Sequence, residues 1–134
     1  MSTDSSAAAP STPSAPDSSD FEALAAPWLP LPDVAERLGL EVAKVRRLLQ
    51  ERDLIGARVG ERRILCVPEA LLMDGEPVPD LRGTLSVLVD SGYSDEEALR
   101  WLFTPDESLP GTPVDALREN RRKEVRRRAQ ALAF

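Results

Sequence analysis

The chain has 134 residues and a formal net charge of −6, from 17 Lys and Arg against 23 Asp and Glu. It contains no His and a single cysteine, Cys66. These absences exclude Ser-His and Cys-His catalytic pairs, an internal disulfide and a metal site built from several thiolates. We therefore expect no enzyme and no cofactor. No run approaches the roughly 20 apolar residues of a membrane span, so the sequence predicts a cytoplasmic protein.

The charges are unevenly distributed along the chain. Residues 1–26 carry four acidic residues and no basic one, and residues 27–75 carry eight of each. Residues 76–117 have nine acidic residues against two arginines, whereas residues 118–134 have seven bases against two acids. Because charges act over a Debye length of about 8 Å, the charge of a segment matters more for phosphate binding than the total. The acidic total therefore does not exclude a nucleic-acid partner.

Residues 1–26 are predicted to form a disordered tail. Nine of the first 20 residues are Ser or Thr and three are Pro, which leaves little apolar surface to bury. Phe21, Leu24 and Trp28 are the residues that can pin the end of this tail to a core. Two interpretations stay open. The tail is a solubilising extension, or it is phosphorylated by a Ser/Thr protein kinase, with Thr3 and Thr12 as candidate sites.

Residues 27–75 have the pattern of a winged helix-turn-helix. Leu31, Val34 and Leu38 recur at helical spacing, and Gly39 follows where a helix commonly ends. A second periodic run covers residues 42–52, after a turn short enough for a helix-turn-helix. Two β-prone runs then follow, at residues 54–59 and 63–67, on either side of a predicted hairpin tip at Gly60 and Glu61. Residues 69–73 are predicted to be a short helix.

The second predicted helix and the hairpin gather the polar side chains that suit duplex DNA. Arginine forms bidentate hydrogen bonds with guanine and glutamine does so with adenine, while arginines on a wing suit the minor groove or the backbone. The candidate DNA-binding residues are Ala43, Lys44, Arg46, Arg47, Gln50, Arg58, Arg62 and Arg63. The alternative is a solvated face whose charges pair with Glu41, Glu51 or Asp53. We expect binding of double-stranded DNA.

The rest of the chain, residues 76–134, is predicted to be a helical domain. Residues 74–80 have the composition of a linker, and a helix is expected over residues 81–89. Ser94 and Glu97 have the spacing of a capping box that starts the next helix. Thr112 and Pro113 begin a helix that runs through Leu117 and can continue to residue 132. The fold class is therefore mainly α, with a small β-hairpin wing.

The basic end of this second domain is a further candidate site. Lys123, Arg126 and Arg127 point away from the apolar stripe of the predicted helix and are candidates for secondary phosphate contacts. One alternative is a surface helix with ion pairs between Glu119 and Lys123 and between Glu124 and Arg128. In another, this helix pairs with the acidic segment 76–117, within the chain or across a dimer.

Residues 31–67 resemble the winged helix-turn-helix of excisionase-like and MerR-type proteins, through the motifs DVAERLG, VRRLL and R-x-G-x-x-R-x-L. Residues 27–134 resemble more closely a small actinobacterial family of DNA-binding proteins in which a winged helix precedes a helical C-terminal domain. The resemblance implies a non-catalytic regulator or nucleoid-associated protein. It also implies that Val45, Leu48 and Leu49 are core positions of a DNA-facing helix. Glu41 stands where excisionase-like motifs usually have a Ser or Thr cap.

Residues 111–133 also resemble the end of antitoxins of the Xre/MbcA/ParS type, over a short stretch. This likeness and the acidic segment support a second hypothesis. The chain is then a protein-interaction adaptor or antitoxin-like module that binds a partner, or itself, through residues 76–134.

Overall fold

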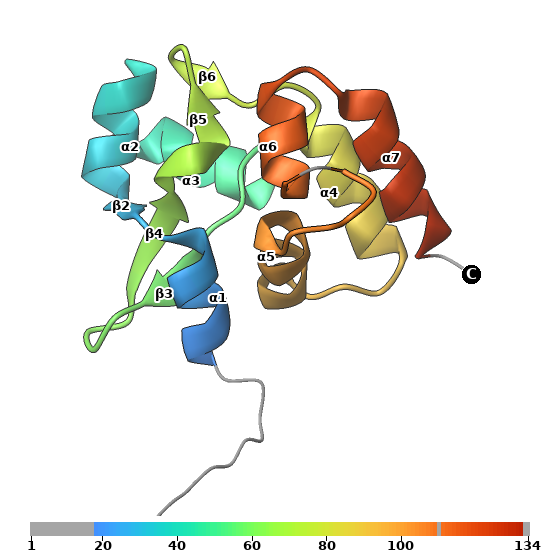
Figure 1. The fold of residues 1–134 in the computed structure, drawn as a ribbon. Coiled ribbons are helices and arrows are strands. Elements are labelled where there is room, and N and C mark those ends of the chain that lie inside the picture. Colours follow the sequence, from blue (N-terminus) through green and yellow to red (C-terminus); the bar gives the residue numbers. More distant parts are fainter. Residues whose placement is uncertain (1–17, 110, 133–134) are drawn as a thin grey trace, which may run out of the picture.

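The computed structural model describes residues 18–109 and 111–132, which form a mostly helical protein with two small antiparallel sheets (Figure 1). The fold class predicted from the sequence is confirmed: a winged helix-turn-helix is followed by a helical C-terminal region. Thr3 and Thr12 lie outside the described residues.

The first described element, α1 (Ser18–Ala25), packs against α5 (Asp95–Phe103) of the C-terminal region. Phe21 and Ala25 are fully buried, whereas Leu24 is 42% exposed. The prediction of a disordered tail is therefore wrong for residues 21–25. Two buried apolar side chains one helical turn apart make α1 part of the core. Of the three residues expected to attach this segment, Phe21 is the one that is fully buried.

The helix-turn-helix consists of α2 (Leu31–Leu38) and α3 (Val42–Gln50). Gly39 ends α2 in the left-handed conformation, with φ of 67°, as the sequence predicted. Val34 and Val45 are fully buried, and the two helices pack against each other. α3 is two residues shorter than predicted, because Arg52 has a φ of 59° and turns the chain away from the helix.

The wing is the hairpin of β3 (Ala57–Val59) and β4 (Ile64–Pro68). Gly60 and Arg63 both have positive φ in its four-residue loop, so Arg63 belongs to the turn and not to the predicted strand. A third strand, β2 (Trp28–Pro30), pairs with the other edge of β4 and gives the order β2-β4-β3. β2 was not predicted, since three residues that end in Pro carry no alternating pattern.

Residues 69–80 differ from their prediction. A 3₁₀ turn (Glu69–Leu71) leads into a second hairpin of β5 (Leu72–Met73) and β6 (Glu76–Pro77). The predicted helix is therefore wrong beyond Leu71, and residues 74–80 are not a linker. Asp74 and Gly75 have φ of 55° and 80°, the positive values that a two-residue hairpin turn requires.

The C-terminal region contains α4 (Leu81–Asp90), α5, α6 (Pro113–Arg118) and α7 (Arg122–Ala131). Both predicted starts, at Ser94 and Thr112, are complete capping boxes. A single helix from Pro113 to residue 132 is wrong, because Asn120 has a φ of 64° and separates α6 from α7. The two helices then pack against each other.

One hydrophobic cluster joins the two regions. It includes Val34 and Leu54 from the winged helix as well as Leu85 and Leu99 from the C-terminal helices. Arg118 also donates hydrogen bonds from Nη1 to backbone oxygens of the first region. The predicted domain boundary after residue 75 separates two patterns in the sequence. In the structure, one hydrophobic core extends across that boundary.

Candidate nucleic-acid interface

The polar face that was predicted on the second helix exists on α3. Its helical periodicity puts Val45 in the core, and Leu48 and Leu49 are half-buried against it. The five candidate residues of this helix are all exposed: Ala43, Lys44, Arg46, Arg47 and Gln50. The helix therefore presents a cationic and amide-bearing surface to solvent.

The acidic residues near α3 do not neutralise this surface. Asp53 pairs with Arg82 of α4, with 3.4 Å between Oδ1 and Nη1. Among the side chains that the structure describes, no ion pair joins Lys44, Arg46 or Arg47 to any carboxylate. Glu41 is the N-cap of α3, but its side chain makes no capping hydrogen bond. The alternative interpretation, a solvated face whose charges pair with nearby acidic residues, predicted ion pairs that are not found among the described side chains.

A surface hollow of about 350 Å³ brings α3 and the wing together. Arg46 contributes to it from α3, and Pro30, Leu31 and Pro32 contribute from the start of α2. The wing supplies its three candidate arginines, Arg58, Arg62 and Arg63. Four of the eight predicted site residues therefore line one concave surface, whereas Ala43, Lys44, Arg47 and Gln50 lie on α3 outside it.

The wing arginines are held in different ways. Arg58 donates from Nη1 to the backbone oxygen of Arg63 over 3.3 Å, which ties the guanidinium to the turn. Glu22 of α1 lies beside the same turn: one carboxylate oxygen accepts the Gly60 N–H at 3.4 Å. Its other oxygen is 3.7 Å from Nη1 of Arg63. Sequence reasoning missed Glu22, because nothing in the sequence signals that the region before β2 returns to the wing.

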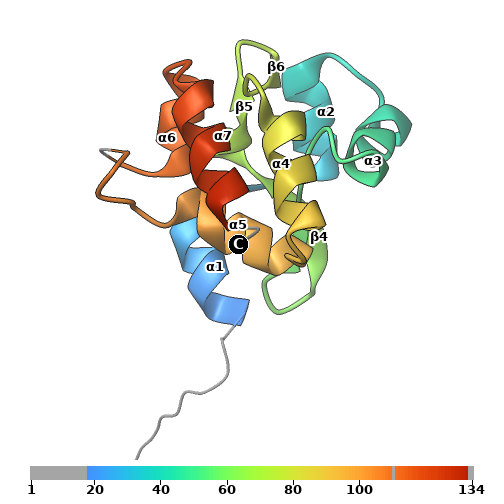
Figure 2. The same cartoon turned by 90° about the vertical axis from the view of Figure 1, so that its right-hand side faces the viewer.

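The second candidate group lies on α7. Lys123, Arg126 and Arg127 line one hollow of about 430 Å³ with Arg122, Gln130 and Asp80. The ion pairs predicted for Glu119 and Glu124 are wrong, since both carboxylates pair with Arg121, at 2.9 and 3.5 Å. In Figure 2 this helix and α3 lie on opposite sides of α4. The structure therefore separates α7 from the surface formed by α3 and the wing.

Other reactive groups have structural explanations. Burial, with a smaller contribution from Asp33, raises the pKa of the Cys66 thiol on β4. Ser94 holds the pKa of Glu97 below its ordinary value through the capping box. Within residues 18–109 and 111–132, no cluster of three or more Cys, Asp or Glu side chains is arranged to hold a metal ion. In the same residues no helix has the length and apolarity needed to cross a membrane.

The arrangement defines a class. Two short helices joined at a glycine turn pack against each other, and the first of them packs on a three-stranded sheet. The hairpin of that sheet shares a hollow with the exposed face of the second helix. This is a winged helix-turn-helix protein, here followed by four further helices among the described residues.

Comparisons with known proteins identify the family. Residues 14–72 match the family model described as "DNA-binding protein Rv2175c, wHTH domain". Residues 78–133 match the one described as "Rv2175c C-terminal domain of unknown function". The chain is 41% identical over 121 residues to the DNA-binding protein Rv2175c of Mycobacterium tuberculosis (strain ATCC 25618 / H37Rv), covering 81% of this chain and 82% of that protein. The NMR structure of Rv2175c superposes with a TM-score of 0.73 at 40% identity, over 81% of this chain and 82% of the other. The chain belongs to the Rv2175c family.

Proposed function

We propose that this protein binds double-stranded DNA by inserting α3 into the major groove, with the wing against the neighbouring backbone or minor groove. The observation that carries the proposal is the shared hollow of Arg46 and the three wing arginines. It lies next to an α3 face whose cations have no acidic partner among the described side chains. A helix in the major groove needs polar side chains for base edges and positive charge for flanking phosphates.

The residues have distinct roles in this proposal. Arg46, Arg47 and Gln50 carry the donors for base edges, and Lys44 supplies charge to a phosphate. Ala43 leaves room for close approach of the helix. Arg58, Arg62 and Arg63 contact the backbone or a narrow minor groove. The name of the relative from M. tuberculosis, a DNA-binding protein, supports the same function.

We infer that the protein binds DNA and does not catalyse a reaction. We place this activity in the cytoplasm, on the nucleoid. The protein then acts as a regulator of transcription or as an architectural protein, according to the sequence specificity that it shows. Selection of bound duplexes from a random pool distinguishes these two roles. Enrichment of one motif supports a regulator, and an unchanged pool supports an architectural protein.

The docking is tested by replacing Arg46 and Arg47 with Ala, singly and together. Loss of a base contact should cost about 1–3 kcal/mol of binding free energy, while loss of a phosphate contact should lower the salt slope by about one. Arg37→Ala is the matched control, because this arginine lies on α2 and pairs with Glu69 at 2.6 Å. Unchanged binding by the double variant would contradict the docking.

A protein partner for residues 76–134 is a second candidate function. It is favoured by a hollow of about 410 Å³ that Tyr93 and Trp101 line together with Glu97 and Arg100. Aromatic and arginine side chains are enriched at protein interfaces. Purification of a stoichiometric partner with the wild-type protein, and its loss with Trp101→Ala, would support this function.

A further inference from the structure

A hollow lies on the flank of α3 that faces away from the wing. On a helix with 3.6 residues per turn, Leu48 lies about 200° around the axis from Arg46. Arg46 borders the wing hollow, while Leu48 borders a second hollow of about 700 Å³ that reaches the first turn of α4. Asp80 and Arg126 line both this hollow and the hollow on α7. The two hollows therefore adjoin at Asp80 and Arg126, and we call the pair of hollows the trough.

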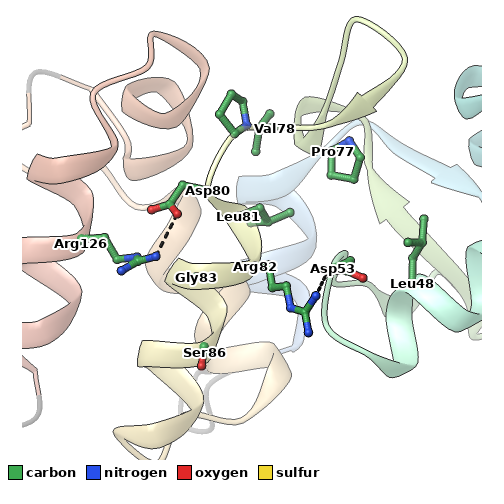
Figure 3. A pocket seen from close by; sticks show the side chains of 11 residues that line it. Leu48, Asp53, Pro77, Val78, Asp80, Leu81, Arg82, Gly83, Ser86 and Arg126 are labelled. Carbon is green, nitrogen blue, oxygen red and sulfur yellow. Dashed lines mark hydrogen bonds and ion pairs between the residues drawn. The ribbon is translucent and has the colours of Figure 1, made fainter.

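Two ion pairs lie among the side chains that line the hollow next to α3, as Figure 3 shows. Arg82 and Asp53 join α4 to the loop after α3, and Arg126 reaches from α7 to Asp80, with 2.9 Å between Nη2 and Oδ1. A Cβ at position 83 would collide with the guanidinium of Arg126, so only glycine lets that side chain lie across α4. The portion next to α3 is thus electrically balanced.

The portion on α7 is not balanced. Four bases line this hollow, namely Arg122, Lys123, Arg126 and Arg127, and Asp80 is the one acidic residue among its lining side chains. Arg122, Lys123 and Arg127 are exposed and have no ion pair with any carboxylate among the described residues. Three unpaired cations around one concave surface attract a polyanion, and closely spaced phosphates give each cation a partner.

We propose that the hollow on α7 is a second contact for the phosphates of duplex DNA, separate from α3 and the wing. The proposal rests on the DNA binding proposed above and assigns a role to the C-terminal helices. The phosphates belong either to the duplex that α3 reads, which then passes over the trough, or to a second duplex. Arg126 positions the surface, whereas Arg122, Lys123 and Arg127 make the contacts.

The test measures the salt dependence of binding by the full chain to a duplex of about three helical turns. Each phosphate contact contributes about 0.9 to the slope of log K against log salt concentration. The variant Arg122→Gln/Lys123→Gln/Arg127→Gln should lower the slope by the amount expected for the loss of about two to three phosphate contacts. Arg126 stays intact, because its pair with Asp80 fastens α7 to α4.

A neighbouring residue supplies the matched control. Arg128 is exposed on α7 and does not line the hollow, so Arg128→Gln changes the charge equally but should leave the slope unchanged. Arg127→Gln should lower the slope by about one contact. Equal effects of these two substitutions would overturn the site, because they would indicate general attraction by the charged helix.

Two arms distinguish the source of the phosphates. If one duplex spans both surfaces, the difference between wild type and the triple variant disappears on a duplex of about one turn. If a second duplex binds, wild type links two differently labelled duplexes and the triple variant does not. A triple variant with the wild-type slope but an altered oligomeric state would overturn the proposal in favour of self-association. The Arg46 and Arg47 variants test α3 independently, so failure of this site leaves the proposed function standing.

Discussion

Glu22 and Arg63 connect the N-terminal helix to the wing: the carboxylate of α1 is 3.7 Å from the guanidinium in the β3–β4 turn. The same carboxylate accepts the N–H of Gly60. α1 also packs on α5, so this short helix links the wing to the C-terminal region. Arg63 is consequently the one proposed DNA contact, among the described residues, that an acidic side chain already holds.

Substitution of Glu22 by Gln should strengthen DNA binding. Gln keeps an oxygen to accept the Gly60 N–H but removes the charge that competes with phosphate for Arg63. Because exposed ion pairs are worth about 0.2–1 kcal/mol, the gain should not exceed about fivefold in affinity. Fluorescence anisotropy with a labelled duplex measures it. Glu76→Gln, in the hairpin at the opposite end from the wing tip (Figure 1), is the charge-matched control. Equal affinity of both variants and wild type would show that Glu22 does not compete.

The local signals in the sequence were sufficient for much of the fold. Gly39, Ser94 and Thr112 each act on the backbone within four residues, so their helix boundaries were predictable. The polar face of α3 followed from helical periodicity alone. β2 and the contacts of Glu22 and Arg126 depend on residues between 36 and 46 positions away, which a pattern in one sequence does not encode. Residues 74–80 were wrongly predicted to be a linker, because the prolines in this segment favoured a linker over the hairpin turn that Asp74 and Gly75 indicate.

Phe21→Ala should destabilise the whole protein. The ring is fully buried and meets Trp28 edge to face, with 5.9 Å between ring centroids. Loss of a buried phenylalanine typically costs about 3–5 kcal/mol of unfolding free energy. Urea denaturation measures this cost. Leu24→Ala on the same helix is the control, and its effect should stay near 0.5 kcal/mol because the side chain is mainly exposed. Similar small effects for both would mean that α1 is not part of the core.

Arg118→Ala should weaken the junction between the two regions. Nη1 donates to the backbone oxygens of Ala70 and Leu72, at 2.8 and 2.9 Å, and both acceptors lose this partner in the variant. We expect a loss of about 1–2 kcal/mol in unfolding free energy, with a single cooperative transition in wild type. Arg122→Ala is the control. If Arg118→Ala has the stability of wild type, water replaces the guanidinium at no cost.

The tail gives a prediction about regulation. Residues 1–17 join the described structure at α1, whose Glu22 contacts the wing. Each phosphate adds about −1.5 to −2 charges, which should compete with DNA for the cations of α3 and the wing. Thr3→Glu and Thr12→Glu should therefore bind DNA more weakly than wild type, with Thr3→Gln and Thr12→Gln as uncharged controls. Should all four variants and a chain lacking residues 1–17 have equal affinity, the tail has no part in binding.

The capping box of α5 predicts a dependence of stability on pH. The backbone N–H of Ser94 donates to Oε1 of Glu97 at 2.9 Å, and this bond is the main cause of a Glu97 pKa below the ordinary value of 4.5. A lowered pKa in the folded state stabilises the protein above pH 4.5, and this contribution is lost as the pH falls through the folded pKa. The melting temperature of Glu97→Gln should thus lie below that of wild type at neutral pH, and the difference should shrink in acid. Glu96→Gln removes a carboxylate from the same turn that has no part in the capping box, and it is the control for the loss of one charge. A difference for Glu97→Gln that stays constant from neutral pH to well below pH 4.5 would contradict the assignment.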